Sequence, residues 1–197
     1  MPQSRRYKKK KSAGKAILAW IIVLAILAAG VLVFVSVFYE DAKKKLDEMN
    51  YPRTYSTYVE KAAKDYDLDP ALIYAVIHTE SGFDPKAESG VGAKGVMQMM
   101  PSSFEWLQEQ RGCAGQYTED DLFDPEICID YGSYLLKYFY DYYGTERSAI
   151  AAYNAGFVVS DWLNDTNYSS DGKNLDSIPY PETENYVDKV ESAKEMY

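Results

Sequence analysis

One glutamate in the sequence lies inside an apolar helical pattern, where a charged group is unusual. In the segment DPALIYAVIHTESGFDP, Glu80 follows Ile73, Val76 and Ile77 by seven, four and three residues, so its carboxyl group lies on the apolar stripe near the end of a predicted helix. Burial disfavours the charged form of an acid, and the negative end of the helix dipole acts in the same direction. We therefore predict a raised pKa for Glu80, which a general acid in glycosidic cleavage requires. From this position alone, a glutamate that simply reaches solvent is an equally good interpretation.

Three motifs follow one another in the chain, beginning at Glu80. The first is ESGFDPKAESGVGAKGVMQMMP at residues 80–101, the second is AAYNAG at 151–156, and the third is PETENYV at 181–187. In this order they resemble the motifs of the soluble-lytic-transglycosylase family, enzymes that cut bacterial peptidoglycan. The sequence departs from the family pattern only conservatively, at Val96 and Met99.

The resemblance covers about residues 56–197 and implies a mainly α, lysozyme-like fold, nominally α+β, with a long sugar-binding groove. Glu80 would be the single catalytic acid/base, protonating the glycosidic oxygen between N-acetylmuramic acid and N-acetylglucosamine. It would then take the proton from the 6-hydroxyl of the muramic acid, which closes onto C1 as a 1,6-anhydro ring. Most glycosidases use two carboxylates, but an internal hydroxyl held near C1 removes the need for the second. No cofactor is expected, and Asp84 and Glu88 are interpreted as solvated turn residues.

The same resemblance assigns six further residues to substrate binding. They are Ser89, Gln98, Met100, Tyr153, Asn154 and Glu182. The first three would line the groove, the last two would complete its opposite wall, and Tyr153 would hydrogen-bond near Glu80 and help set its protonation. For Gln98 and Met100 the structural alternatives are a loop-anchoring amide and core packing. For Tyr153 and Glu182 they are a buried aromatic residue and a first-turn helix residue.

A stretch of 24 uncharged residues, 16–39, precedes this domain. As a helix it would be about 36 Å long, which is enough to cross a bilayer. We favour an uncleaved anchor over a signal peptide, whose apolar region normally runs about 7–15 residues, and over a buried core helix, which is seldom apolar all round. Seven cationic residues and no acid precede residue 16, so the positive-inside rule predicts a single-pass cell-membrane protein with a cytoplasmic N-terminus and an extracytoplasmic domain.

Composition and charge exclude two classes of function. Beyond residue 39 there are 14 basic and 30 acidic residues, a formal charge of -16, which is unsuited to binding nucleic acid. One histidine and two cysteines leave a zinc site short of ligands, so no metal is predicted. In an oxidising compartment Cys113 and Cys128 would close a disulfide loop of about 15 residues. Free thiols are the alternative.

Boundary chemistry divides the chain into a basic tail (1–15), a membrane helix (16–39), a polar spacer (40–54) and a domain (55–197). Asp69-Pro70 and Asp124-Pro125 each supply an N-cap followed by a first-turn proline, and Ser102 begins a capping-box pattern. No convincing strand pattern occurs, and 82–101 and 163–181 have no periodicity of their own. The predicted helical spans are 56–67, 70–81, 102–111, 125–143, 146–155 and 182–196.

The fourth predicted helix carries an aromatic stripe. Tyr131, Tyr134, Leu135, Tyr138 and Tyr142 recur at helical spacing, which favours an aromatic core stripe over a sugar-stacking platform.

The sequence as a whole predicts a membrane-anchored lytic transglycosylase acting on peptidoglycan glycan strands. A hydrolytic muramidase on the same fold and a catalytically silent glycan-binding or scaffold module are the alternatives. The anchor (16–39) contacts the membrane, and a protein partner from the cell-wall or secretion machinery stays unidentified.

Overall fold

The computed structural model describes residues 13–197, except for the side chains of residues 13–16 and of residue 48. The predicted basic tail, residues 1–15, lies almost entirely outside the described residues. The chain divides into two compact units, one ending at Asn50 and the other comprising Tyr51–Tyr197. Each unit is described by itself.

The first unit is a single helix, α1 (Ala13–Asn50), of 38 residues. Large apolar side chains along it are exposed, from 44% at Val23 to 77% at Met49. Its stretch Ile17–Asp47 is long and apolar enough to cross a membrane, judged by length and composition. The helix continues through most of the predicted polar spacer because residues 40–50 contain no proline or glycine.

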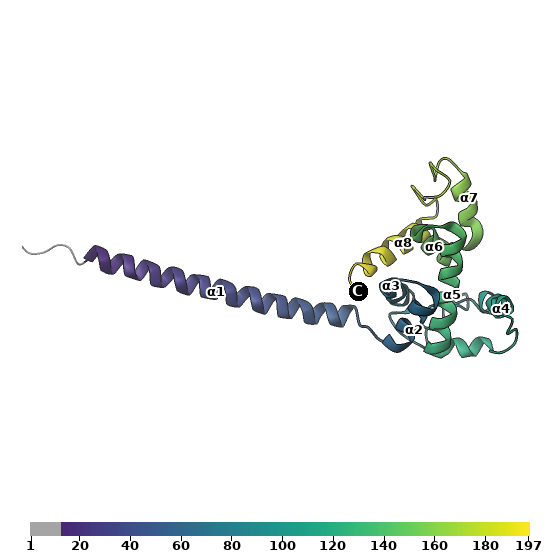
Figure 1. Ribbon diagram of the computed structural model, residues 1–197, viewed down its shortest axis with the longest axis horizontal. Coiled ribbons are helices and arrows are strands. Elements are labelled where there is room, and N and C mark those ends of the chain that lie inside the picture. Colours follow the sequence, from purple (N-terminus) through teal and green to yellow (C-terminus); the bar gives the residue numbers. More distant parts are fainter. Residues whose placement is uncertain (1–12) are drawn as a thin grey trace, which may run out of the picture. The chain divides into compact units, whose positions relative to one another are not determined.

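The second unit consists of helices joined by loops (Figure 1). Its only β-type pairings in the described chain are two isolated bridges, Glu88 with Lys94 and Lys94 with Met99, so the predicted mainly α fold is confirmed. The short helices η1, η2 and α7 were not predicted. The elements are α2 (Ser56–Tyr66), α3 (Pro70–Ser81), α4 (Pro101–Gln110), η1 (Glu119–Phe123), α5 (Pro125–Tyr143), α6 (Glu146–Ala155), η2 (Gly156–Val158), α7 (Val159–Asn164) and α8 (Pro181–Lys194).

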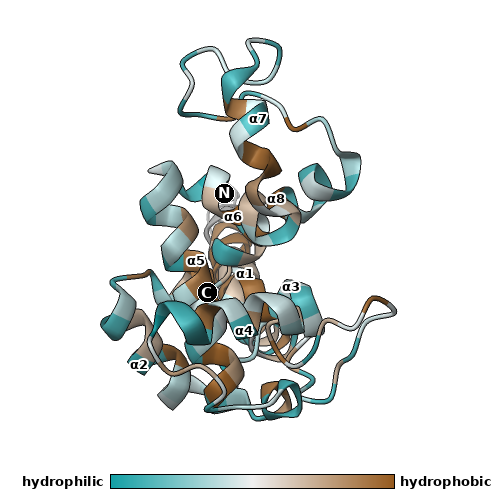
Figure 2. Cartoon of the chain, turned by 90° about the vertical axis from the view of Figure 1, so that its right-hand side faces the viewer, coloured by the Kyte–Doolittle hydropathy of each residue, from teal (hydrophilic) through white to brown (hydrophobic). Residues whose placement is uncertain are grey.

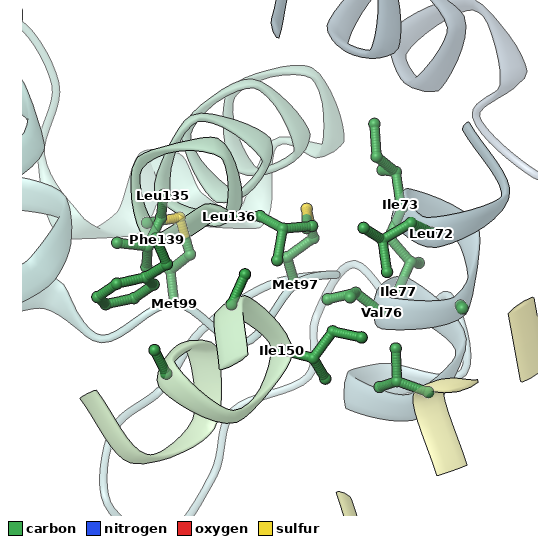
Figure 3. Close-up of a cluster of buried hydrophobic side chains, with 14 of the residues drawn as sticks. Leu72, Ile73, Val76, Ile77, Met97, Met99, Leu135, Leu136, Phe139 and Ile150 are labelled. Carbon is green, nitrogen blue, oxygen red and sulfur yellow. The ribbon is translucent and has the colours of Figure 1, made fainter. Parts of the chain in front are cut away.

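The helices pack as two connected groups around one apolar core. Helix α5 packs against α2 and α6, while α8 packs against α3 and α6. Met97, from the loop between α3 and α4, lies between the side chains of α3 and Leu136 of α5 (Figure 3). A Cβ atom on Gly132 of α5 would lie 2.5 Å from the Met97 sulfur. The polar loop after α7 is largely hydrophilic (Figure 2).

Two of the three predicted helix starts are confirmed by their hydrogen bonds. The side chains of Asp69 and Asp124 each accept a backbone N–H two residues later at 2.9 Å, and a proline follows each cap. The predicted capping box at Ser102 is wrong. Helix α4 begins one residue earlier, at Pro101, and Met100 at the N-cap makes no side-chain capping bond, because the fixed φ of proline already favours a first helical position.

The predicted disulfide is also wrong, since both cysteines are free thiols. Cys128 is fully buried on α5, and its sulfur accepts the Met97 N–H at 3.4 Å. The Cys113 sulfur lies 3.3 Å from the Tyr131 hydroxyl. A spacing of 15 residues is compatible with a bridge, but each sulfur is held by its own neighbours, and a bridge requires specific orientation as well as proximity.

The loop between α3 and α4 passes so close to η1 that one position accepts only glycine. Gly95 has φ +75, and a Cβ atom there would lie 2.0 Å from the Leu122 carbonyl oxygen. The Gly95 N–H also donates to the Ala87 carbonyl at 2.9 Å. This loop therefore depends on a close backbone contact with η1.

We expect Gly95→Ala to destabilise the protein far more than Gly92→Ala. Both glycines have positive φ, but a Cβ atom on Gly92 would meet nothing within 4 Å, so Gly92→Ala incurs backbone strain of about 1–3 kcal/mol alone. Gly95→Ala adds the clash with Leu122 and should cost more than about 3 kcal/mol. Chemical denaturation measures both losses. Equal losses would contradict the close-contact interpretation.

Candidate active site

Helix α3 carries Glu80 to the edge of the core. All six residues from Leu72 to Ile77 are buried, and Glu80 follows within one turn, partly buried. Gly82 then ends the helix with φ 59 and donates its N–H to the His78 carbonyl at 3.0 Å. The Ser81 hydroxyl donates to the Val96 carbonyl at 2.8 Å. The end of α3 is therefore fixed to the following loop directly beside Glu80.

Burial raises the pKa of Glu80 to about 7, and the Tyr186 hydroxyl lowers it in part. That hydroxyl is buried and makes no hydrogen bond of normal length and angle, yet it lies close enough to stabilise the carboxylate. The pKa shift predicted from the helical position of Glu80 is confirmed. Because its pKa is near neutrality, the acid can both give and take a proton there.

Three buried groups that are neutral at pH 7 surround Glu80. They come from three helices: Cys128 from α5, Tyr153 from α6 and Tyr186 from α8. Burial is the main reason that the pKa of each of these groups is raised, and the negative charge of Glu80 adds to it. The two influences on the pKa of Glu80 itself are burial and the Tyr186 hydroxyl, and neither is a second carboxylate.

The acids nearby in sequence lie in solvent. Asp84 is exposed and accepts the Lys86 N–H at 2.8 Å, and Glu88 is exposed. This agrees with their interpretation as solvated turn residues.

Tyr153 holds the loop backbone next to Glu80. Its hydroxyl donates to the Met97 carbonyl at 2.9 Å, while the Met97 N–H donates to the Cys128 sulfur at 3.4 Å. The loop is thus fixed between α5 and α6. The Tyr153 hydroxyl therefore donates its proton to Met97 rather than to Glu80, and a role for Tyr153 in setting the protonation of Glu80 stays a prediction.

Ser89 and Gln98 make hydrogen bonds within their own loop. The Ser89 hydroxyl oxygen accepts the Ala93 N–H at 2.9 Å. The Gln98 amide donates to the carbonyls of Ala87 and Gly95 at 3.0 and 2.9 Å. The Gln98 amide nitrogen therefore anchors the loop, as the structural alternative for this residue expects. Substrate contact by Ser89 or Gln98 stays a prediction.

Three other predicted residues meet around one hollow. Met100, Tyr153 and Asn154 line a cavity of 260 Å³. Met100 is 38% exposed, so it is not core filler. The Asn154 side-chain oxygen accepts the Thr183 hydroxyl at 2.8 Å, which links α6 to the start of α8. Glu182, next to Thr183, is exposed.

A larger hollow of 500 Å³ has residues of α3 and α8 in its lining, His78 and Asp188 among them. Glu80 does not line it. We identify the site by the perturbed carboxyl group, because chemistry rather than volume marks a catalytic position.

Sequence reasoning did not assign a role to Tyr186. The sequence signal that could have indicated Tyr186 was its spacing of three and four residues from Thr183, Val187 and Val190, which is typical of one helix face. These residues form the buried face of α8. Only the packing of α8 against α3 shows that this face meets Glu80.

Comparison with known proteins places these features in one family. Residues 57–175 match a family model described as the transglycosylase SLT domain. The chain is 32% identical over 146 residues to the soluble lytic murein transglycosylase of Escherichia coli K12, covering 73% of this chain and 23% of that protein. It is 30% identical over 167 residues to membrane-bound lytic murein transglycosylase C of Actinobacillus succinogenes, covering 74% and 47%.

The fold matches a solved structure as well. The 70 kDa soluble lytic transglycosylase of Escherichia coli aligns with a TM-score of 0.68 and 28% identity, over 77% of this chain and 25% of that one. The chain thus spans less than half the length of each of these relatives.

The raised pKa of Glu80 predicts a pH-dependent stability. Between pH 4.5 and 7 the folded protein binds more protons at Glu80 than the unfolded chain does, so this group makes stability fall as pH rises. Glu80→Gln should therefore stabilise the protein by up to about 3 kcal/mol at pH 8 and change little at pH 4. Thermal unfolding at both pH values measures this, with Glu88→Gln as the exposed control. A pH-independent effect of Glu80→Gln would contradict the assignment.

Proposed function

The chain belongs to the transglycosylase SLT family, and from this premise we propose that it is a peptidoglycan lytic transglycosylase. It cleaves the β-1,4 bond between N-acetylmuramic acid and N-acetylglucosamine and leaves 1,6-anhydro ends. The observation that carries this proposal is the pKa of about 7 at Glu80, in a buried setting whose other titratable groups are neutral. A single acid/base of this kind suits a reaction in which the same group gives and then takes a proton.

The proposed reaction needs two proton transfers at Glu80. In the first, the neutral acid donates its proton to the glycosidic oxygen as the bond from C1 to that oxygen breaks. In the second, the Glu80 carboxylate accepts the proton of the muramic 6-hydroxyl, whose oxygen bonds to C1. Glu80 ends protonated as it began, and no water is consumed. Holding the hydroxyl near C1 provides the high effective concentration that a second carboxylate would otherwise have to supply.

Tyr186 is the proposed positioning residue for the charged intermediate state of Glu80. Its buried hydroxyl has no other hydrogen-bond partner and lowers the pKa of Glu80. It would donate more strongly once the carboxylate has formed, because hydrogen bonds to charged groups are the stronger ones. Tyr153, whose proton is held by Met97, keeps the loop in place.

The groove is proposed to run past both sides of Glu80. Met100 and Asn154 contact substrate from their shared cavity, with Glu182 exposed beyond them at the start of α8. Ser89 and Gln98 line the same wall as Met100, where their loop hydrogen bonds fix the backbone, and Asn154 and Glu182 complete the opposite wall.

Helix α1 is the proposed membrane anchor. Its exposed apolar side chains have no partner in the described chain, and one relative is named as membrane-bound. The seven cations of residues 1–15 favour an N-terminus in the cytoplasm and a catalytic domain outside, by the positive-inside rule. The substrate, peptidoglycan, lies in the same compartment.

The product of the reaction tests the proposed function. Full-length protein in detergent micelles should release fragments with anhydro-muramic ends from purified peptidoglycan, detected by mass spectrometry. Glu80→Gln cannot donate the proton and should lower the rate at least 100-fold, whereas Glu88→Gln should retain it. Reducing ends would instead indicate a hydrolytic muramidase, and no product from the parent protein would indicate a glycan-binding module.

The pH profile tests the role of Tyr186. The alkaline limb of kcat/KM should lie near pH 7, because activity needs protonated Glu80. Tyr186→Phe removes an interaction that lowers this pKa, so the limb should move upward by roughly 0.4–1 pH unit, the equivalent of one hydrogen bond of about 0.5–1.5 kcal/mol. Tyr74→Phe is the control, since Tyr74 is also a buried tyrosine with an unpartnered hydroxyl. Equal profiles for all three proteins would exclude the assigned role.

A further inference from the structure

A polar pocket lies along α3 and α8, outside the set of residues already assigned to the substrate. We call it the α3–α8 pocket. Its volume of 500 Å³ falls within the roughly 300–1,000 Å³ that is typical of ligand pockets. The residues that line it are Tyr51, His78, Thr79, Asn185, Asp188, Lys189, Ser192 and Ala193.

The α3–α8 pocket begins next to the candidate active site. The two helices run antiparallel, because an ion pair of 3.1 Å joins the last residue of α8 to the N-cap of α3. Thr79 directly precedes Glu80, and Asn185 directly precedes Tyr186. Successive residues of a helix lie about 100° apart around its axis. The pocket is therefore on the flank of α3 and α8, beside the face on which Glu80 meets Tyr186.

The neutral polar side chains of the pocket are not used by the protein itself. Neither ring nitrogen of His78 makes a hydrogen bond within the described residues, and the ring is held by stacking on Tyr51 at 5.1 Å and 28°. The side chains of Thr79, Asn185 and Ser192 likewise make no hydrogen bond in the part of the chain that the structure describes. Donors and acceptors that could bind the amide groups of a ligand are thus gathered in one hollow.

Lys189 gives the pocket an unpaired positive charge. It is exposed on α8, and its ammonium group forms no ion pair with any described residue. Several other cations of the same unit pair with acids, namely Lys61, Lys94, Arg111, Lys137, Arg147 and Lys194. The ammonium group of Lys189 therefore stays available to a carboxylate, with which it would form a charge-assisted hydrogen bond.

Asp188 restricts the kind of anion that can bind. Its carboxylate lies 3.7 Å from the Arg147 guanidinium and is 62% exposed, so it stays open to a ligand. A ligand with several negative charges would be repelled there. A ligand that carries both a carboxylate and an amine would find a partner for each, on Lys189 and on Asp188.

We propose that the α3–α8 pocket binds the stem peptide of peptidoglycan, with a peptide carboxylate at Lys189 and the amine of the peptide's diamino acid at Asp188. This inference rests on the proposed function and concerns a second part of the same substrate. The peptide is attached to the muramic acid, whose bond to the next sugar Glu80 breaks. Three extended residues span about 10 Å, so a peptide attached near the reacting bond can enter the pocket. The protein would then act preferentially on strands that carry their peptides.

Two substrates that differ only in the peptide test the pocket. The full chain in detergent micelles digests glycan strands with their stem peptides and the same strands after an amidase has removed the peptides. The measured quantity is the ratio of the two kcat/KM values, which should favour the peptide-bearing strands. Lys189→Met removes the charge and should lower this ratio about 2- to 10-fold, the range expected for one hydrogen bond.

Three further variants complete the series. Lys189→Arg keeps the charge and should largely retain the ratio, whereas Asn185→Ala should lower it. Lys64→Met is the matched control, because Lys64 is an exposed lysine of α2 that also has no ion pair among the described residues and does not line the pocket.

Binding of the peptide alone separates the pocket from catalysis. The full chain with Glu80→Gln is titrated calorimetrically with the tripeptide L-alanyl-γ-D-glutamyl-meso-diaminopimelate. Adding Lys189→Met should weaken binding about 2- to 10-fold. The same tripeptide with its carboxylates amidated should bind more weakly to the protein that retains Lys189.

Three outcomes would overturn the pocket. They are equal kcat/KM of the parent protein on both substrates, a ratio unchanged by Lys189→Met, and tripeptide binding that is absent or does not depend on Lys189. Any of them would leave the pocket to another class of ligand, such as a protein segment. Cleavage of both substrates with a failed pocket test leaves the proposed function intact. Tripeptide binding that needs Lys189, without cleavage of either substrate, supports the pocket and rejects the function.

Discussion

Burial of the Glu80 carboxyl group at the end of α3 is the constraint on which the rest of the site depends. Residues 72–77, in the turns before Glu80, are all buried, so this end of the helix cannot move away from the core without exposing them. A charged carboxylate is costly there, and the acid stays protonated up to about pH 7. The buried acid therefore lowers the stability of the protein as pH rises toward 7, and it also provides a proton donor at neutral pH. This combination is common at catalytic positions.

The loop between α3 and α4, which would form one side of the proposed groove, has no β-sheet. The loop is held by two isolated bridges, by the hydrogen bonds of the Gln98 amide and by the close approach of Gly95 to Leu122, in place of a regular β-ladder. Met97 connects this loop to the helices, because its side chain enters the core and its backbone bonds to Tyr153 and Cys128. The groups that hold the loop also lie near the acid, since the charge of Glu80 helps to raise the pKa of both Cys128 and Tyr153.

The proposed groove changes character along its length. Near Glu80 the two buried tyrosines have different tasks, because the Tyr153 hydroxyl is bound to Met97 and the Tyr186 hydroxyl stays available to the carboxylate. Farther along, the lining of the cavity of Met100 and Asn154 contains no charged residue. Proton transfer would thus be confined to one point, while the neighbouring cavity would recognise the strand by shape.

The sequence alone determined the six longer helices of the domain, to within a few residues, and the placement of the acid, because both depend on interactions within about one helical turn. The aspartate caps before Pro70 and Pro125 form as predicted, and the apolar spacing around Glu80 correctly indicated burial and a raised pKa. Tertiary packing decided the rest. The partners of the Met97 backbone lie 31 and 56 residues away, the Tyr186 hydroxyl reaches Glu80 only because α8 packs against α3, and the cysteine sulfurs are held by separate neighbours. Side-chain orientation across such distances depends on how the helices pack, and no local pattern encodes it.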